Sequence, residues 1–203
     1  MKFVYFDIGG VLMKDLSDTN DGWGILLKSL GLKDDQRQKF NDYFEVLEKK
    51  LDLGEGIEEF VLKMKNDFGV RLPKNYSISD DLVNRFFHKN EEMWRIVEEV
   101  KNKHQVGLLT NMYFGMLDLI KNKKLIPDID WTIVDSSVEK CRKPDKRIYE
   151  IAQDKSGFKG KDILFIDNRQ ENLEMPKKMG WQTYWYDSSD YEKSNWKLSN
   201  FLR

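Results

Sequence analysis

The sequence has a single cysteine, Cys141, among 203 residues, so the chain by itself forms no disulfide framework and a reducing compartment is indicated. No apolar run reaches the roughly 18 residues of a membrane-spanning helix, and the apolar start is interrupted by Asp7 too early for a signal peptide. Neither charge is in excess, since 34 Lys and Arg stand against 35 Asp and Glu. This balance argues against nucleic acid or an anionic membrane as a partner. We therefore expect a cytoplasmic protein.

Histidine is scarce as well, and the two that occur, His88 and His104, stand apart without metal-ligand spacing. Aromatic residues make up 13% of the chain and apolar residues 40%, which excludes a disordered protein. The length allows one domain or a domain that carries an insertion. Without repeats or low-complexity segments, the organisation must come from the order of strands and helices.

The most informative stretch is residues 2–12, KFVYFDIGGVL. Residues that favour strands run directly into Asp7, two glycines and another apolar pair, which is the pattern of a buried strand that delivers a carboxylate into a tight loop. An aspartate after a strand is also a common turn former or helix cap. The stretch alone leaves both interpretations open.

Residues 14–88 show helical periodicity and no convincing strand. The first three apolar stripes end at glycines, and Ser79 and Asp80 are the expected N-cap pair of the fourth. The aromatic side chains of these stripes are most simply core. The stripes cover residues 23–30, 40–51, 57–68 and 82–87. We predict a separate helical domain over residues 14–88.

Strand and helix signals alternate again after residue 89. Such alternation, with right-handed crossovers, produces a parallel sheet with helices on both faces. We therefore predict an α/β fold in which residues 1–13 and 89–203 form a Rossmann-like sheet flanked by helices, with the helical bundle inserted after the first strand. The later strands are expected at residues 105–109, 131–134, 162–166 and 182–186.

Polar residues stand where several of these strands end. Asp7, Thr110, Asn111 and Asp167 follow predicted strands, and Lys143 lies in the loop after another. Ligands of such sheets bind beyond the carboxyl ends of the strands, so these side chains are expected to converge on one crevice. Two carboxylates suit Mg²⁺, while a hydroxyl, an amide and a lysine can hold a phosphate. Asp7 can then serve as a nucleophile that forms an aspartyl-phosphate.

Four segments, in order and spacing, resemble the four motifs of the haloacid dehalogenase-like hydrolase superfamily. They are residues 7–12 (DIGGVL), 108–111 (LLTN), 142–145 (RKPD) and 165–168 (FIDN). Each motif alone is weak evidence, whereas the ordered set is specific. The resemblance spans nearly the whole chain, because residues 14–88 stand where many members carry a small helical cap.

The resemblance implies an Mg²⁺-dependent phosphatase of a small phosphorylated metabolite, with sugar phosphates among the candidates. Asp7 would be the nucleophile, and the metal would be held by Asp7, Asp167 and the backbone carbonyl of Gly9. Thr110 and Lys143 would hold the phosphate, and Lys143 would also neutralise the surroundings of the nucleophile. The cap would select the substrate.

Two positions depart from the family pattern. Gly9 stands where the phosphatases usually carry an aspartate that protonates the leaving group, help that is typically worth about 10²- to 10⁴-fold in rate. Asn168 stands where a second aspartate often follows Asp167, so weaker Mg²⁺ binding is expected.

Three interpretations follow from Gly9. The first is a phosphatase biased toward leaving groups that are weak bases, as in anomeric sugar phosphates or acyl phosphates. The second is a 2-haloacid dehalogenase, although those enzymes have a tyrosine at the position of Gly9 and an arginine soon after, whereas the nearest arginine here is Arg37. The third is a binding or regulatory protein that lost catalysis, against which the retained Asp7, Lys143 and Asp167 argue.

Overall fold

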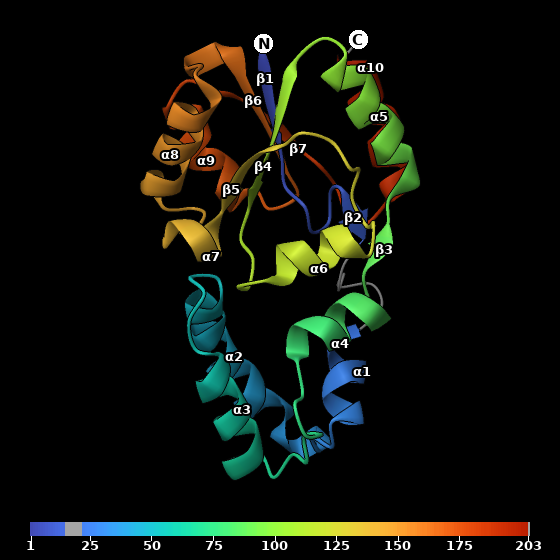
Figure 1. The fold of residues 1–203 in the computed structure, drawn as a ribbon, viewed down its shortest axis with the longest axis vertical. Helices are drawn as coiled ribbons and strands as arrows, with labels where there is room; N and C mark the ends of the chain where they lie inside the picture. The colour runs from blue at the N-terminus through green and yellow to red at the C-terminus, as the bar shows by residue number, and fades with distance from the viewer. Residues whose placement is uncertain (15–21, 203) are drawn as a thin grey trace.

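A computed structural model describes residues 1–14 and 22–202; residues 15–21 of the predicted helical domain lie outside the described residues. Its centre is a parallel five-stranded sheet with the order β5-β4-β1-β6-β7 (Figure 1). This confirms the predicted Rossmann-like α/β fold. The strands are β1 (Phe3–Phe6), β4 (Gln105–Thr110), β5 (Thr132–Asp135), β6 (Ile163–Asp167) and β7 (Gln182–Trp185).

Both faces of the sheet are buried, because alternate residues of β1 point to opposite sides. Phe3 and Tyr5 pack with α8 (Lys146–Ser156) and α9 (Glu171–Lys178), whereas Val4 and Phe6 belong to the core that α5 (Glu91–Lys101) and α10 (Tyr191–Leu202) cover. The shorter helices α6 (Met116–Asn122) and α7 (Ser136–Glu139) lie near the carboxyl ends of the strands, and the 3-10 helix η2 (Gly160–Asp162) precedes β6 (Figure 1).

A helical lobe, residues 22–85, lies beyond the carboxyl ends of the strands (Figure 1). It consists of α1 (Gly22–Ser29), the 3-10 helix η1 (Asp34–Gln36), α2 (Arg37–Leu51), α3 (Ile57–Asn66) and α4 (Ile78–Arg85). Rings of Trp23, Phe40, Phe44 and Phe60 contact one another there. Phe40 and Phe60 are fully buried core, as expected, whereas Trp23 and Phe44 are half-buried. The predicted N-cap of α4 was wrong: the cap is Ser77, whose extended backbone lets its hydroxyl accept a hydrogen bond from the Asp80 N–H.

Two short strands join the lobe to the sheet domain. β2 (Met13–Lys14) pairs antiparallel with β3 (His88–Lys89), at the points where the chain leaves for the lobe and returns from it. No strand was predicted at either place, because two residues are too few to show an alternating pattern. The buried Asn90 fastens the junction by donating a hydrogen bond to the Val11 carbonyl at 2.8 Å.

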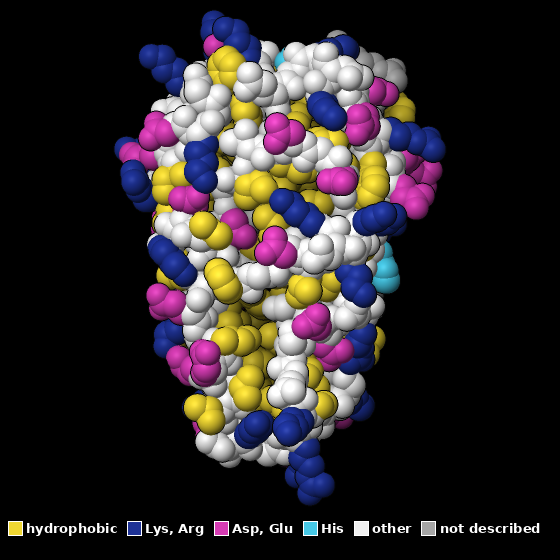
Figure 2. Space-filling model, viewed as in Figure 1, with side chains coloured by type: hydrophobic (Ala, Val, Ile, Leu, Met, Phe, Trp, Pro, Cys, Tyr) yellow, Lys and Arg dark blue, Asp and Glu magenta, His cyan; other side chains and the backbone are white. Residues whose placement is uncertain are grey.

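The surface agrees with the balanced charge of the sequence. Figure 2 shows Lys and Arg side chains interspersed with Asp and Glu over this face, among the described residues. Hydrophobic side chains are visible between the helices of the lobe in the lower half of the view (Figure 2). No helix in the described part of the chain is long and apolar enough to cross a membrane.

Gly107 marks the tightest point of the sheet. A Cβ atom at this position would lie 2.5 Å from Cε1 of Tyr5 and 2.7 Å from the main-chain oxygen of Thr132. Since Tyr5 is fully buried and its hydroxyl bonds the Ala152 carbonyl, the ring has no room to retreat. We expect Gly107→Ala to lower the free energy of unfolding by about 1–3 kcal/mol, measured by urea denaturation.

The matched control is Val46→Ala on α2, where the side chain is 64% exposed. This change is expected to stay within about 0.5 kcal/mol of the parent. Equal stability of the Gly107 variant and the parent would show that the sheet relaxes around the added methyl group.

Candidate active site

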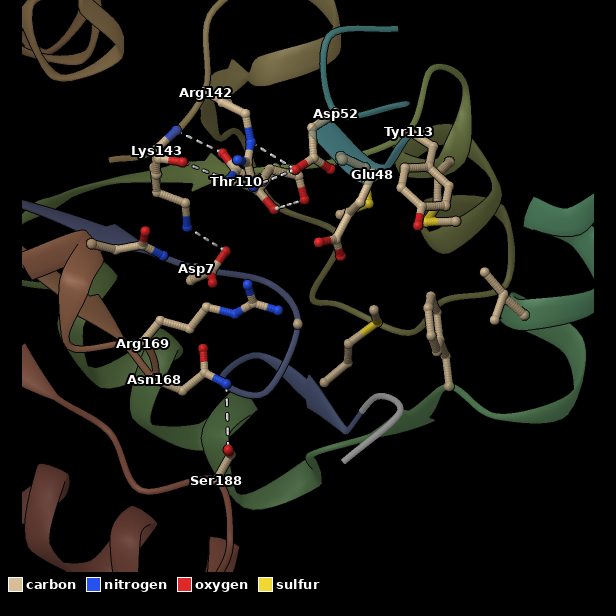
Figure 3. Close-up of a pocket in the computed structure, with 18 of the residues that line it drawn as sticks. Asp7, Glu48, Asp52, Thr110, Tyr113, Arg142, Lys143, Asn168, Arg169 and Ser188 are labelled. Carbon is tan, nitrogen blue, oxygen red and sulfur yellow. Dashed lines mark hydrogen bonds and ion pairs between the residues drawn. The ribbon is translucent and has the colours of Figure 1, made fainter. Parts of the chain in front are cut away.

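A cavity of about 540 Å³ lies between the carboxyl end of the sheet and the helical lobe. Its sheet side brings together Asp7, Thr110, Asn111 and Lys143, which the strand ends predicted to converge, and Gly9, which the family resemblance implied as a metal ligand. Asp7, Thr110 and Lys143 are labelled in Figure 3. Asp167 is fully buried directly behind them and contacts Lys143. The predicted convergence therefore holds in space, while the roles of these residues remain predictions.

Asp7 is the carboxylate that faces the cavity from the sheet side. It follows β1, and its main-chain N–H donates to the Ile166 carbonyl at 2.9 Å, which fixes it at the strand end. Its Oδ1 accepts hydrogen bonds from the Ile8 N–H at 2.8 Å and from Lys143 at 2.9 Å. Burial raises the pKa of Asp7 to about 7; Lys143 lowers it, and the neighbouring Asp167 raises it further. The second oxygen has no hydrogen-bond donor among the described residues and is free for a ligand.

Lys143 is a buried charge between two carboxylates. Its side chain is 1% exposed, and its Nζ lies 2.9 Å from Oδ1 of Asp7 and 2.7 Å from Oδ2 of Asp167. Burial opposes the ammonium charge, but Asp167 and Asp7 outweigh that effect and raise the Lys143 pKa. Such a lysine is not a solvated loop residue, since a buried ammonium is stable only when it is paired.

Asp167 anchors the site from behind. Its Oδ1 accepts from the Arg169 main-chain N–H at 2.7 Å, and the Asn172 amide donates to both of its oxygens at 3.1 and 3.0 Å. With the Lys143 contact, each oxygen is engaged. These bonds hold the carboxylate in one orientation, which in turn fixes the ammonium of Lys143.

Asn111 is occupied chiefly with positioning Lys143. Its Oδ1 accepts from the Lys143 main-chain N–H at 2.8 Å, and its Nδ2 donates to the Lys143 carbonyl at 3.0 Å. One amide N–H is left for a substrate. The hydroxyl of Thr110 donates only a long bond, 3.4 Å, to the Asn111 carbonyl, so it is readily redirected toward a ligand in the cavity.

Several charged or polar cavity residues had no role assigned from the sequence, among them Glu48, Asp52, Tyr113, Arg142, Arg169 and Ser188 (Figure 3). Glu48 lies on α2 and Asp52 caps its carboxyl end, so the spacing of four places both on one helix face. That spacing is visible in the sequence, but the direction in which the face points is not.

Asp52 connects the lobe to the sheet domain. Its carboxylate binds Arg142 through Nε and a terminal nitrogen, both at 2.9 Å, and its carbonyl accepts from Ser136 Oγ at 2.5 Å. Burial raises the pKa of Asp52 to about 6, against the lowering effect of Arg142. The pair is thus a largely buried contact between the two parts of the molecule.

This contact predicts a pH dependence. Because the pKa of Asp52 in the folded protein, about 6, lies above its ordinary 3.8, the folded state binds this proton more tightly. The contribution of Asp52 to the free energy of unfolding therefore falls as pH rises from about 4 to about 6 and is constant above that range. Asp52→Asn removes this slope and keeps an acceptor for Arg142.

The measurement is urea unfolding of the parent and Asp52→Asn between pH 4 and 7. The stability of the variant relative to the parent should increase with pH up to about 6, and the titration of Asp7 is common to both proteins. Parallel curves would show that the Asp52 carboxyl titrates normally.

The donor set fits a hard cation. Among the described residues no three His, Cys, Asp or Glu side chains are grouped to hold a metal. The site instead offers the open oxygen of Asp7, and Gly9, whose carbonyl is the expected third ligand, lines the same cavity. The expected second ligand, Asp167, lies behind Asp7 with both oxygens hydrogen-bonded, so it would have to exchange one of these bonds for the metal. These are oxygen donors, as Mg²⁺ prefers. Burial is the main cause of the raised pKa of Asp7, and a divalent cation beside this carboxylate would favour its charged form.

The parallel sheet, with a carboxylate after its central strand and a helical insertion over the strand ends, defines the class: a Rossmann-like α/β fold with its site at the carboxyl edge. The model of the haloacid dehalogenase-like hydrolase family matches residues 1–180. The chain therefore belongs to this family and is a hydrolase of its type. No curated protein matches the chain.

Solved structures share the fold at low sequence identity. A HAD family enzyme of Bacteroides thetaiotaomicron matches with a TM-score of 0.79 and 17% identity, over 100% of this chain and 98% of its own. A predicted HAD-like hydrolase of Porphyromonas gingivalis matches with 0.76 and 22%, over 100% and 98%. An L-2-haloacid dehalogenase matches with 0.62 and 15%, over 92% and 84%. The Bacteroides enzyme has also been solved with magnesium and inorganic phosphate.

Proposed function

We propose that the protein is an Mg²⁺-dependent phosphatase that hydrolyses a small phosphorylated metabolite through an aspartyl-phosphate on Asp7. The observation that carries the proposal is the buried arrangement of Asp7, Lys143 and Asp167, in which one oxygen of Asp7 is left open to the cavity. A protein that only binds a ligand has no need of a carboxylate whose ionisation is sustained by a buried lysine. The magnesium and phosphate complex of the Bacteroides enzyme supports the same chemistry.

Each residue has a definite task in this reaction. Asp7 attacks phosphorus with its free oxygen, while Lys143 holds the other oxygen in place and favours the ionised form of the carboxylate. Thr110 and the remaining N–H of Asn111 hold the phosphoryl oxygens. Asp167, Asp7 and the Gly9 carbonyl would hold Mg²⁺, which supplies positive charge that screens the two anions from each other.

We also propose that the helical lobe is the cap of this enzyme and that its residues select the substrate. The cap would extend over residues 14–88, and the catalytic domain over 1–13 and 89–203. The support is the position of the cavity, whose far side comes from the lobe residues Trp23, Phe44 and Glu48. A substrate held at Asp7 would have its leaving group among these side chains.

A second candidate is a 2-haloacid dehalogenase. The specific observation in its favour is Arg169. The chain has no arginine soon after the first motif, but Arg169 lines the cavity and could bind the carboxylate of a haloacid substrate in its place. The L-2-haloacid dehalogenase with the same fold makes this chemistry a direct alternative.

One experiment tests both candidates. The purified protein is incubated with Mg²⁺ and a panel of sugar phosphates, aryl phosphates and acetyl phosphate, and separately with 2-chloropropionate, while phosphate and chloride release are measured. Phosphate release that stops when EDTA removes the metal is the expected result. Chloride release without phosphate release would replace the phosphatase with the dehalogenase.

A further inference from the structure

We propose that Arg169 is a catalytic residue whose guanidinium stabilises the leaving-group oxygen of the substrate. Its positive charge would compensate for the general-acid aspartate that is absent at position 9, where this chain has Gly9. The inference deepens the proposed phosphatase function and rests on it. It also specifies the substrate class: phosphates whose leaving group is a weak base.

The first observation is that Arg169 is uncommitted. Of the residues that the structure describes, three cations line the cavity, and two of them are engaged within the protein, Arg142 with Asp52 and Lys143 with the two site carboxylates. The guanidinium of Arg169 has no hydrogen bond or ion pair to any residue that the structure describes. Its main chain is bonded instead: the N–H donates to Asp167 at 2.7 Å and the carbonyl accepts from the Asn172 N–H at 3.2 Å, which fixes the backbone at the end of β6. An unpaired guanidinium in a ligand cavity is suited to an anionic oxygen.

The second observation is where the guanidinium lies. It extends into the cavity beside Asp7, and Glu48 of the lobe faces it (Figure 3). Burial lowers the pKa of Arg169, but Glu48 and then Asp7 raise it more, which agrees with a position between these two carboxylates. The charged group thus stands between the nucleophile and the lobe.

The direction of phosphoryl transfer assigns the role. Attack on phosphorus is in line, so the leaving oxygen departs on the side opposite Asp7, toward the lobe. The sheet order places β4, which carries Thr110, on one side of β1, and β6, which precedes Arg169, on the other. The groups that hold the phosphoryl oxygens therefore approach from one side, and Arg169 reaches the leaving-group path from the other.

The step balances without a protein acid. An Asp7 oxygen forms the bond to phosphorus, while the bond from phosphorus to the leaving oxygen breaks and both electrons stay on that oxygen. The resulting anion lies against the guanidinium and takes its proton from water. Arginine does not give up a proton in proteins, so this device suits aryl, acyl and anomeric phosphates and serves simple alkyl phosphates poorly. The aromatic rings of Trp23, Phe44 and Phe87 in the cavity favour an apolar or aryl leaving group.

The test uses a series of phenyl phosphates, from nitrophenyl to methoxyphenyl, so that the leaving group changes in basicity while the phosphoryl group stays the same. Arg169→Gln should lose about 10²-fold in kcat/KM for the most basic leaving group but about 10-fold or less for the nitrophenyl substrate. Arg169→Lys should recover part of the loss, because a cation returns to the position. The control is Arg147→Gln on α8, where the side chain is 68% exposed, and it should match the parent.

Equal losses along the series would place Arg169 on the phosphoryl oxygens and overturn this inference alone, as would an unchanged Arg169→Gln. Circular dichroism confirms that each variant is folded. Wild-type protein that releases no phosphate from any member would overturn the proposed function and this inference together.

Discussion

Asp7→Asn should abolish phosphate release, with a fall in kcat of about 10⁴- to 10⁶-fold. The amide is nearly the same size as the carboxylate and still accepts the hydrogen bonds from Ile8 and Lys143, so the geometry is kept. What disappears is the nucleophilic oxygen that faces the cavity. The measurement is phosphate release under saturating substrate and Mg²⁺.

The stability of this variant separates catalysis from folding. Burial already raises the pKa of Asp7 to about 7, so a neutral side chain is well tolerated at this position. We expect the free energy of unfolding at neutral pH to be unchanged or higher. The control is Asp154→Asn, an exposed carboxylate on α8, which should leave both quantities as in the parent. Substantial activity in Asp7→Asn would show that another group attacks phosphorus.

The sequence was sufficient for the sheet and for the strand ends because those features have short-range signatures. Each core strand is an apolar run followed at once by a polar residue, as in Asp7 and Asp167. Parallel topology then follows from the alternation with helices, and it brings the strand ends to one edge. Lys143 lies in the loop after another strand, so the same edge of the sheet brings it to Asp7 and Asp167.

The lobe side of the site has no such signature. Glu48 and Asp52 are two charged residues on a helix of 15 residues, and only the docking of that helix decides that they face the cavity and not solvent. Arg169 stands two positions after Asp167, so its loop was predictable, but only the docking of the lobe places Glu48 across the cavity from its guanidinium. The strands β2 and β3 are likewise fixed by pairing between distant segments.

Lys143→Met should remove both activity and stability. The ammonium is the shared partner of Asp7 and Asp167, and methionine fills the space without the charge. We expect phosphate release to fall by about 10³-fold or more and the free energy of unfolding at pH 7 to fall by about 3–5 kcal/mol, because two buried carboxylates lose their shared cation. Urea denaturation and the phosphate assay measure the two effects.

The loss of stability in Lys143→Met should depend on pH in a defined direction. Without Lys143, which lowers it, the pKa of Asp7 rises further above its ordinary 3.8, so the folded state takes up a proton. The variant should therefore become less stable as pH rises above about 4 and recover toward acid pH. Adding Asp7→Asn to Lys143→Met removes one carboxylate and should restore part of the stability but none of the activity.

Lys146→Met, which replaces an exposed lysine on α8, is the control, and the surface ion pair that it removes is worth at most about 1 kcal/mol. If Lys143→Met were as stable as this control, the carboxylates would not depend on the ammonium, and the charge balance that the site requires would have to come from the metal alone.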